Sequence, residues 1–123
     1  MVARPLVSIV DDDESVRESL PDLLEELGFN VQAFASAEEF LASSVVNDTR
    51  CLLLDVAMPG MSGPALQQEL ARQRRDIPIV FITASGDASI RPQLLAAGAV
   101  DCLIKPFAES ALLEAVTTAL RAA

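Results

Sequence analysis

Cys51-Leu52-Leu53-Leu54-Asp55 carries the strongest structural signal in the chain, because four consecutive apolar residues end in a carboxylate. A strand covered on both faces is apolar throughout, whereas a half-exposed strand alternates apolar and polar residues. We therefore predict that Cys51 to Leu54 forms a central parallel strand with helices on both faces. Asp55 then lies at its carboxyl end, and a loop rich in Pro and Gly, Met58 to Pro64, follows.

Four other apolar segments have the length of strands. They are Leu6 to Val10, Val31 to Phe34, Ile79 to Ile82 and Val100 to Ile104. Five strands alternating with five helical segments predict a parallel sheet with right-handed crossovers. Periodicity does not reveal the strand order. Among doubly wound α/β folds of this size we expect the flavodoxin-like order 2-1-3-4-5, in a single (βα)5 domain over residues 1–123.

The helical segments carry apolar residues at spacings of three and four. In the first, Ser15 and Glu18 predict a capping box, Gly28 predicts the end, and Pro21 predicts a kink. The apolar positions that identify the helices are Val16, Leu20, Leu23, Leu24 and Leu27, then Leu66 and Leu70, and finally Leu112, Val116 and Leu120.

Two shorter helices have their own start signals. Ser36 to Ala42 reads as a helix capped by Ser36, with Glu39 three residues further on. The fourth helix, around Ile90 to Ala97, contains Pro92, which would cost about 3 kcal/mol in a helix interior. We therefore expect this helix to start late, with Ser89 as its cap and Pro92 in its first turn.

Composition excludes several classes of function. The formal net charge is −9 and there is no His, which argues against direct contact with nucleic acid. No apolar run reaches the roughly 18 residues of a membrane span, so we expect a cytoplasmic protein without membrane contact. Cys51 and Cys102 lie in apolar stretches and are interpreted as buried reduced thiols, not as a disulfide or part of a zinc site.

Chemically active side chains follow the predicted strands where each one ends. Asp11, Asp12 and Asp13 follow the first strand, Asp55 ends the third, Thr83 ends the fourth and Lys105 follows the fifth. In such sheets the functional crevice lies beyond the carboxyl ends of the strands. Clustered carboxylates repel one another unless a cation is bound, and Mg²⁺ prefers such oxygen ligands.

Each of these residues has a simpler explanation when taken alone. An Asp run often caps a helix, a strand-end Thr often bonds to the backbone, and a single Lys is usually a surface charge. Together they suit phosphoryl transfer, which needs a nucleophile, a cation and donors for the phosphoryl oxygens. Asp55 would be the nucleophile that forms an aspartyl phosphate, while Lys105 and Thr83 would bind the incoming oxygens.

Over nearly its whole length the sequence resembles the receiver domain of bacterial two-component response regulators. Its motifs are most similar to those of receiver domains that precede helix-turn-helix output domains. The residues that carry the resemblance are Val10-Asp11-Asp12-Asp13, Asp55, Met58-Pro59-Gly60-Met61-Ser62-Gly63, Ile82-Thr83-Ala84, Gly98-Ala99 and Lys105-Pro106-Phe107. The resemblance implies that the chain promotes only its own phosphorylation and dephosphorylation and is not a turnover enzyme. It also implies a phosphoryl donor, either a sensor histidine kinase or a phosphotransfer protein.

The same resemblance assigns the metal ligands. Asp12 would bind Mg²⁺ directly and Asp11 through water, with Asp55 and the backbone carbonyl of Ala57 as further ligands. In the signalling step it makes Thr83 the switch hydroxyl. We also consider a homodimer through the face formed by the fourth helix, the fifth strand and the fifth helix.

One departure from the family pattern concerns the switch. The family usually places an aromatic residue three positions before the Lys, and this chain has Cys102 there. A thiol is too small to swing between two positions as Tyr or Phe does. We expect phosphorylation to move this surface less than usual.

Two other functions compete with this interpretation. A pseudo-receiver would keep the fold as a protein-binding module without phosphorylation. A phosphatase of the haloacid-dehalogenase type would use Asp11 as nucleophile and Asp13 as acid, but it needs a further acidic pair after Lys105, where only Glu109 and Glu114 follow.

Overall fold

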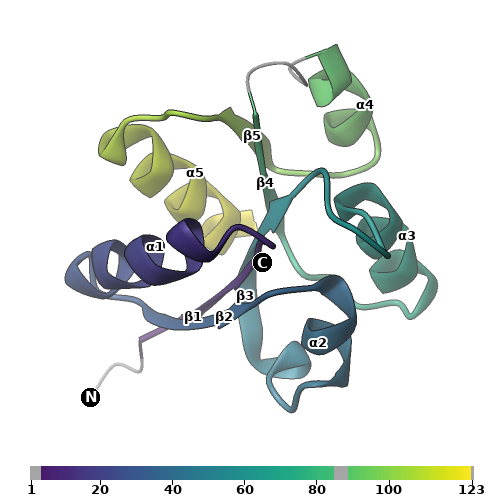
Figure 1. Ribbon diagram of the computed structural model, residues 1–123, viewed down its shortest axis with the longest axis horizontal. Helices are drawn as coiled ribbons and strands as arrows, with labels where there is room; N and C mark the ends of the chain where they lie inside the picture. Colours follow the sequence, from purple (N-terminus) through teal and green to yellow (C-terminus); the bar gives the residue numbers. More distant parts are fainter. Residues whose placement is uncertain (1–3, 85–88, 123) are drawn as a thin grey trace.

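A parallel five-stranded sheet with helices on both faces forms the centre of the molecule (Figure 1). The computed structural model describes residues 4–84 and 89–122. The strand order is β2-β1-β3-β4-β5, which confirms the predicted order and the flavodoxin-like fold. The strands are β1 Leu6–Val10, β2 Asn30–Phe34, β3 Thr49–Asp55, β4 Ile79–Thr83 and β5 Asp101–Ile104.

The helices divide between the two faces of the sheet, with α1 and α5 on one side and α2, α3 and α4 on the other (Figure 1). They are α1 Glu14–Glu26, α2 Ala37–Ala42, α3 Gly63–Arg72, α4 Arg91–Ala96 and α5 Glu109–Ala122. A short 3₁₀ helix, η1 Val46–Asp48, precedes β3 and was not predicted. No helix in these described segments is long and apolar enough to cross a bilayer.

The central strand β3 supplies apolar side chains to both halves of the core. Cys51 and Leu53 pack with the residues of α1 and α5, whereas Leu52 and Leu54 pack with those of α2, α3 and α4. All four are fully buried. Because each buried Leu contributes about 1.5–3 kcal/mol, the continuous apolar run anchors Asp55 at the end of a deeply buried strand.

The start of α1 differs from the prediction. The helix begins at Glu14, and the carboxylate of Asp13 accepts a hydrogen bond from the backbone N–H of Ser15 at 2.9 Å. The predicted capping box of Ser15 and Glu18 is therefore wrong, because Asp13 occupies the cap position and Ser15 already lies in the first turn. Pro21 lies inside this continuous helix, and the kink stays a prediction.

The other helix starts were predicted with mixed success. Ser36 caps α2 by accepting the N–H of Glu39 at 3.1 Å, as predicted. Pro92 lies in the first turn of α4, also as predicted. Ser89 is not the cap of α4, because Ile90 holds that position without a side-chain hydrogen bond. The outer limits of the predicted domain, residues 1 and 123, lie outside the described residues.

Candidate functional site

The carboxyl ends of β3, β4 and β5 meet at one edge of the sheet. Asp55 pairs with Ile82, one residue before the end of β4, and Thr83 pairs with Ile104 at the end of β5. The next residue, Lys105, donates its backbone N–H to the carbonyl of Thr83 at 2.8 Å. The register therefore brings the predicted residues of β3, β4 and β5 to the same edge.

Three carboxylates converge at this edge. One oxygen each from Asp11, Asp12 and Asp55 lies within 4.8 Å of the others. Asp11 is fully buried and Asp55 is 8% exposed, whereas Asp12 is open to solvent. Such a set of hard oxygen donors, partly buried and open on one side, fits a divalent cation that keeps several waters.

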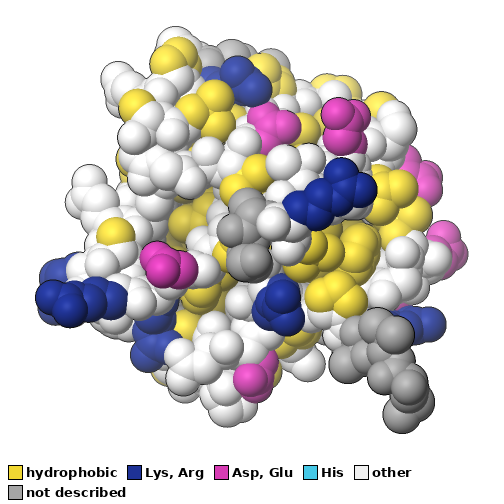
Figure 2. Space-filling model, turned by 180° about the vertical axis from the view of Figure 1, so that it is seen from behind, with side chains coloured by type: hydrophobic (Ala, Val, Ile, Leu, Met, Phe, Trp, Pro, Cys, Tyr) yellow, Lys and Arg dark blue, Asp and Glu magenta, His cyan; other side chains and the backbone are white. Residues whose placement is uncertain are grey.

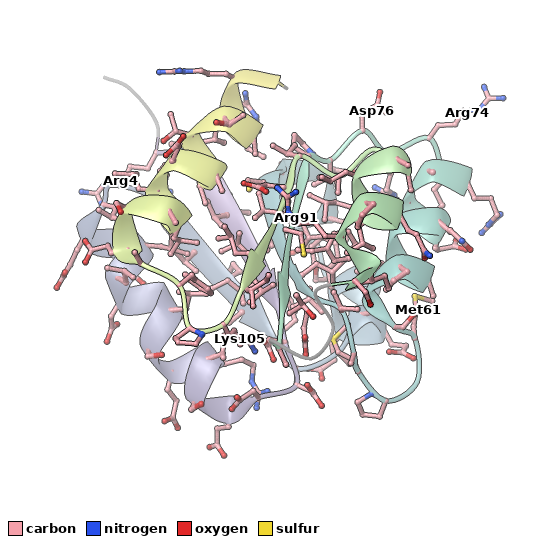
Figure 3. All side chains as sticks on the ribbon, turned by 90° about the horizontal axis from the view of Figure 1, so that it is seen from above. Arg4, Met61, Arg74, Asp76, Arg91 and Lys105 are labelled. Atoms are coloured by element: carbon pink, nitrogen blue, oxygen red, sulfur yellow. The ribbon has the colours of Figure 1, made fainter. Side chains whose placement is uncertain are left out.

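The ammonium group of Lys105 lies beside the buried acid. Lys105 Nζ donates to Asp11 Oδ2 at 3.2 Å, and the other carboxylate oxygen of Asp11 accepts the backbone N–H of Asp13 at 2.9 Å. Arg17 Nη1 donates to the backbone carbonyl of Asp11 at 2.9 Å. Figure 3 shows Lys105 at the opposite end of the molecule from Arg74 and Asp76.

The electrostatics of Asp55 show the cost of gathering these acids. Burial raises the pKa of Asp55 from its ordinary value of 3.8 to about 7, and the neighbouring carboxylates of Asp11 and Asp12 add to the rise. The charge of Lys105 lowers the pKa of Asp55, but by less than burial and the two carboxylates raise it. A bound cation would favour the ionised carboxylate, so the residues present fit Mg²⁺.

Asp13 takes no part in this cluster. Its side chain accepts hydrogen bonds from both the backbone N–H and the hydroxyl of Ser15, and these bonds lower the pKa of Asp13. A phosphatase acid at this position would need a raised pKa to donate a proton near neutral pH. The capping role of Asp13 therefore disfavours the phosphatase alternative.

The structure also places the other residues singled out from the sequence. Thr83 is fully buried, and among the described residues its hydroxyl makes one long contact, 3.4 Å, to the carbonyl of Ala84. Ala57 is exposed in the loop two residues after β3. Cys51 and Cys102 are free and buried, which agrees with the predicted buried thiols. Cys102 lies on β5 opposite Phe81 of β4.

Sequence patterns missed one close contact at this site. A Cβ on Gly63 would lie 2.3 Å from the backbone oxygen of Asp55 and 3.0 Å from the ring of Phe81. Gly63 begins α3 after the cap residue Ser62. Only a residue without a side chain lets this helix start directly against the end of β3.

Comparison with known proteins places this arrangement in a family. Residues 7–117 match the family described as the response regulator receiver domain. This chain belongs to that family. The receiver domain is 47% identical to nodulation protein W of Bradyrhizobium diazoefficiens over 94% of this chain and 51% of that protein. It is 40% identical to the transcriptional regulatory protein FixJ of Azorhizobium caulinodans, over 93% of this chain and 54% of that protein.

Solved structures agree with these relatives. The receiver domain superposes on the response regulator StyR with a TM-score of 0.89 and 48% identity, covering 98% of this chain and 61% of that one. The structure of FixJ-N matches with a TM-score of 0.87 and 40% identity, covering 98% of this chain and 96% of that one. The chain spans about half the length of the curated relatives it matches.

These matches bear on the functional classes considered from the sequence. The chain is a receiver domain of the two-component response regulators, and neither the phosphatase nor the pseudo-receiver is favoured.

Proposed function

We propose that this receiver domain, residues 1–123, accepts a phosphoryl group on Asp55 from a phosphohistidine of a sensor histidine kinase or a phosphotransfer protein. The observation that carries the proposal is the convergence of the Asp11, Asp12 and Asp55 oxygens within 4.8 Å, with Lys105 3.2 Å from Asp11. An oxygen of Asp55 attacks phosphorus, forms the O–P bond, and the N–P bond to the donor imidazole breaks.

Asp12, Asp55 and the carbonyl of Ala57 would hold Mg²⁺, with Asp11 acting through water. The bound ion would offset the negative charge that builds up on the phosphoryl oxygens. The raised pKa of Asp55 supports this assignment, because at neutral pH a smaller fraction of Asp55 is ionised in the metal-free domain than at the ordinary pKa, and a bound cation would restore the ionised nucleophile.

Lys105 and Thr83 would bind the phosphoryl oxygens once they arrive. The ammonium group of Lys105 already lies at the edge of the acid cluster, and within residues 4–84 and 89–122 the hydroxyl of Thr83 makes one long contact. A buried hydroxyl with little competing bonding is free to turn toward an incoming oxygen. Movement of Thr83 toward the phosphoryl group would start the conformational change that signals.

The receiver would promote only its own phosphorylation and dephosphorylation, in the cytoplasm. We propose no direct contact with nucleic acid, because the net charge is −9 and the basic side chains in Figure 2 form separate groups with acidic ones between them. A homodimer through α4, β5 and α5 is supported by Ile104, a large apolar side chain on β5 that is 37% exposed.

Intact-mass measurement after incubation with acetyl phosphate and Mg²⁺ tests the proposal. We expect the wild-type domain and an Asp76→Asn control to gain the mass of one phosphoryl group, and Asp55→Asn to gain none. A wild-type domain that stays unmodified would favour the pseudo-receiver. Steady release of phosphate by Asp55→Asn would favour a phosphatase.

A further inference from the structure

The loop after Asp55 is held to α2 by a single carboxylate. Glu38 Oε2 accepts the backbone N–H of Met61 at 3.2 Å. Among the described residues, no other hydrogen bond joins residues 57–61 to another helix or strand. The loop is otherwise held at its ends, where Val56 donates to the carbonyl of Ile82 at 3.2 Å.

The carboxylate also packs closely against the neighbouring residue of the loop. Gly60 has a φ of +74°, and a Cβ there would lie 2.8 Å from Glu38 Oε2. A side chain at position 60 would therefore displace Glu38, besides adopting a backbone conformation that favours glycine. The turn at Gly60 and Met61 is shaped to receive this one side chain.

Glu38 lies on α2, a helix that is held in place by buried side chains and a cap. Ala37 and Phe40 of α2 are fully buried, and the ring of Phe40 packs edge-on against that of Phe34 at 5.5 Å. Ser36 caps the helix. Because α2 is anchored on both sides of position 38, the Glu38 carboxylate offers the loop a point of attachment that does not depend on the loop itself.

We propose that Glu38 is a positioning residue for the metal site, an inference that rests on the proposed function. By holding the turn at Gly60 and Met61, Glu38 keeps the backbone carbonyl of Ala57 directed toward the cation beside Asp55. Met61 lies toward the same end of the molecule as Lys105 and away from Arg74 and Asp76 (Figure 3). Glu38 itself does not touch the metal or the phosphoryl group.

In this proposal the hydrogen bond from Met61 to Glu38 holds the loop, and the negative charge of Glu38 is not required. Glu38→Gln keeps an oxygen that accepts the N–H of Met61, whereas Glu38→Ala loses it. Glu114→Ala removes the same charge from an exposed site on α5 and is the matched control. Since Glu38 is exposed, we expect all three variants to fold, which thermal melting checks.

The first readout is Mg²⁺ affinity, measured by titration without a phosphoryl donor. We expect Glu38→Ala to bind Mg²⁺ about three- to tenfold more weakly than wild type, with Glu38→Gln and Glu114→Ala close to wild type. The second readout is exchange of the Met61 amide hydrogen in the metal-free domain, which we expect to be faster only in Glu38→Ala.

Two results would overturn the inference. One is a Glu38→Ala variant that matches Glu114→Ala in both Mg²⁺ affinity and Met61 exchange. The other is a Glu38→Gln variant as weak as Glu38→Ala, because the charge would then be what matters. If wild type itself binds no Mg²⁺, the proposed function fails first, a result distinct from a loss confined to Glu38→Ala.

Discussion

Asp55→Asn is expected to stabilise the metal-free domain at alkaline pH, although it removes the proposed phosphoryl acceptor. The carboxyl group of Asp55 has a pKa of about 7 in the folded chain and an ordinary value of 3.8. Below about pH 4 the group is protonated in both states and contributes nothing. Between about pH 4 and 7 the folded state binds more protons than the unfolded state, so stability falls as pH rises.

The magnitude follows from the size of the shift. The pKa rises from 3.8 to about 7, and each unit corresponds to about 1.4 kcal/mol, so the full penalty above pH 7 is about 4 kcal/mol. Asparagine removes the buried charge and keeps the shape of the side chain. That shift already includes the attraction of Lys105 for the Asp55 carboxylate, so we expect a net gain of up to about 4 kcal/mol at pH 8 and almost none at pH 4.

Urea denaturation with a chelator present, at pH 4 and pH 8, measures this difference. Asp76→Asn is the control, because Asp76 is exposed and points away from the molecule (Figure 3). Its effect should stay within about 0.5 kcal/mol at both pH values. Adding Mg²⁺ at pH 8 should stabilise wild type and leave Asp55→Asn unchanged. An equal effect of Asp55→Asn at the two pH values would refute the reasoning.

Three further experiments test other parts of the site. Gly63→Ala places a Cβ 2.3 Å from the backbone oxygen of Asp55 and should cost about 1–3 kcal/mol in urea denaturation; an unchanged midpoint would show that α3 yields freely. Lys105→Ala removes the partner of buried Asp11 and should slow phosphorylation by acetyl phosphate about 10²-fold. Intact-mass measurement over time gives the rate, and a rate equal to that of wild type would exclude Lys105 from the reaction. The NMR chemical shifts of amides around Cys102 should change little when a phosphoryl mimic is added. Large changes there would contradict the expectation that phosphorylation moves this surface less than usual.

The sheet and the convergence of the acids were predictable from local patterns. The continuous apolar run from Cys51 to Leu54 indicates burial on both faces, and the structure buries all four residues. Once the strands are parallel, residues that end them must meet at one edge, so Asp11, Asp55 and Thr83 follow from the topology.

What the sequence did not reveal depends on contacts between distant segments. The bond from Glu38 to Met61 joins residues 23 positions apart, and no periodicity marks it. The cap of α1 was misassigned because Asp13 and Ser15 are both good cap residues, and the structure shows Asp13 in the cap position. The pKa of Asp55 depends on burial and on neighbouring charges, which only the folded arrangement supplies.

A crystal structure of the domain with Mg²⁺ and beryllium fluoride, a mimic of the phosphoryl group, tests the account most directly. We predict the mimic on Asp55 within reach of Lys105 and Thr83, and the ion bound by Asp12, Asp55 and the carbonyl of Ala57. A mimic attached to Asp11, or an ion bound away from these three residues, would contradict the account.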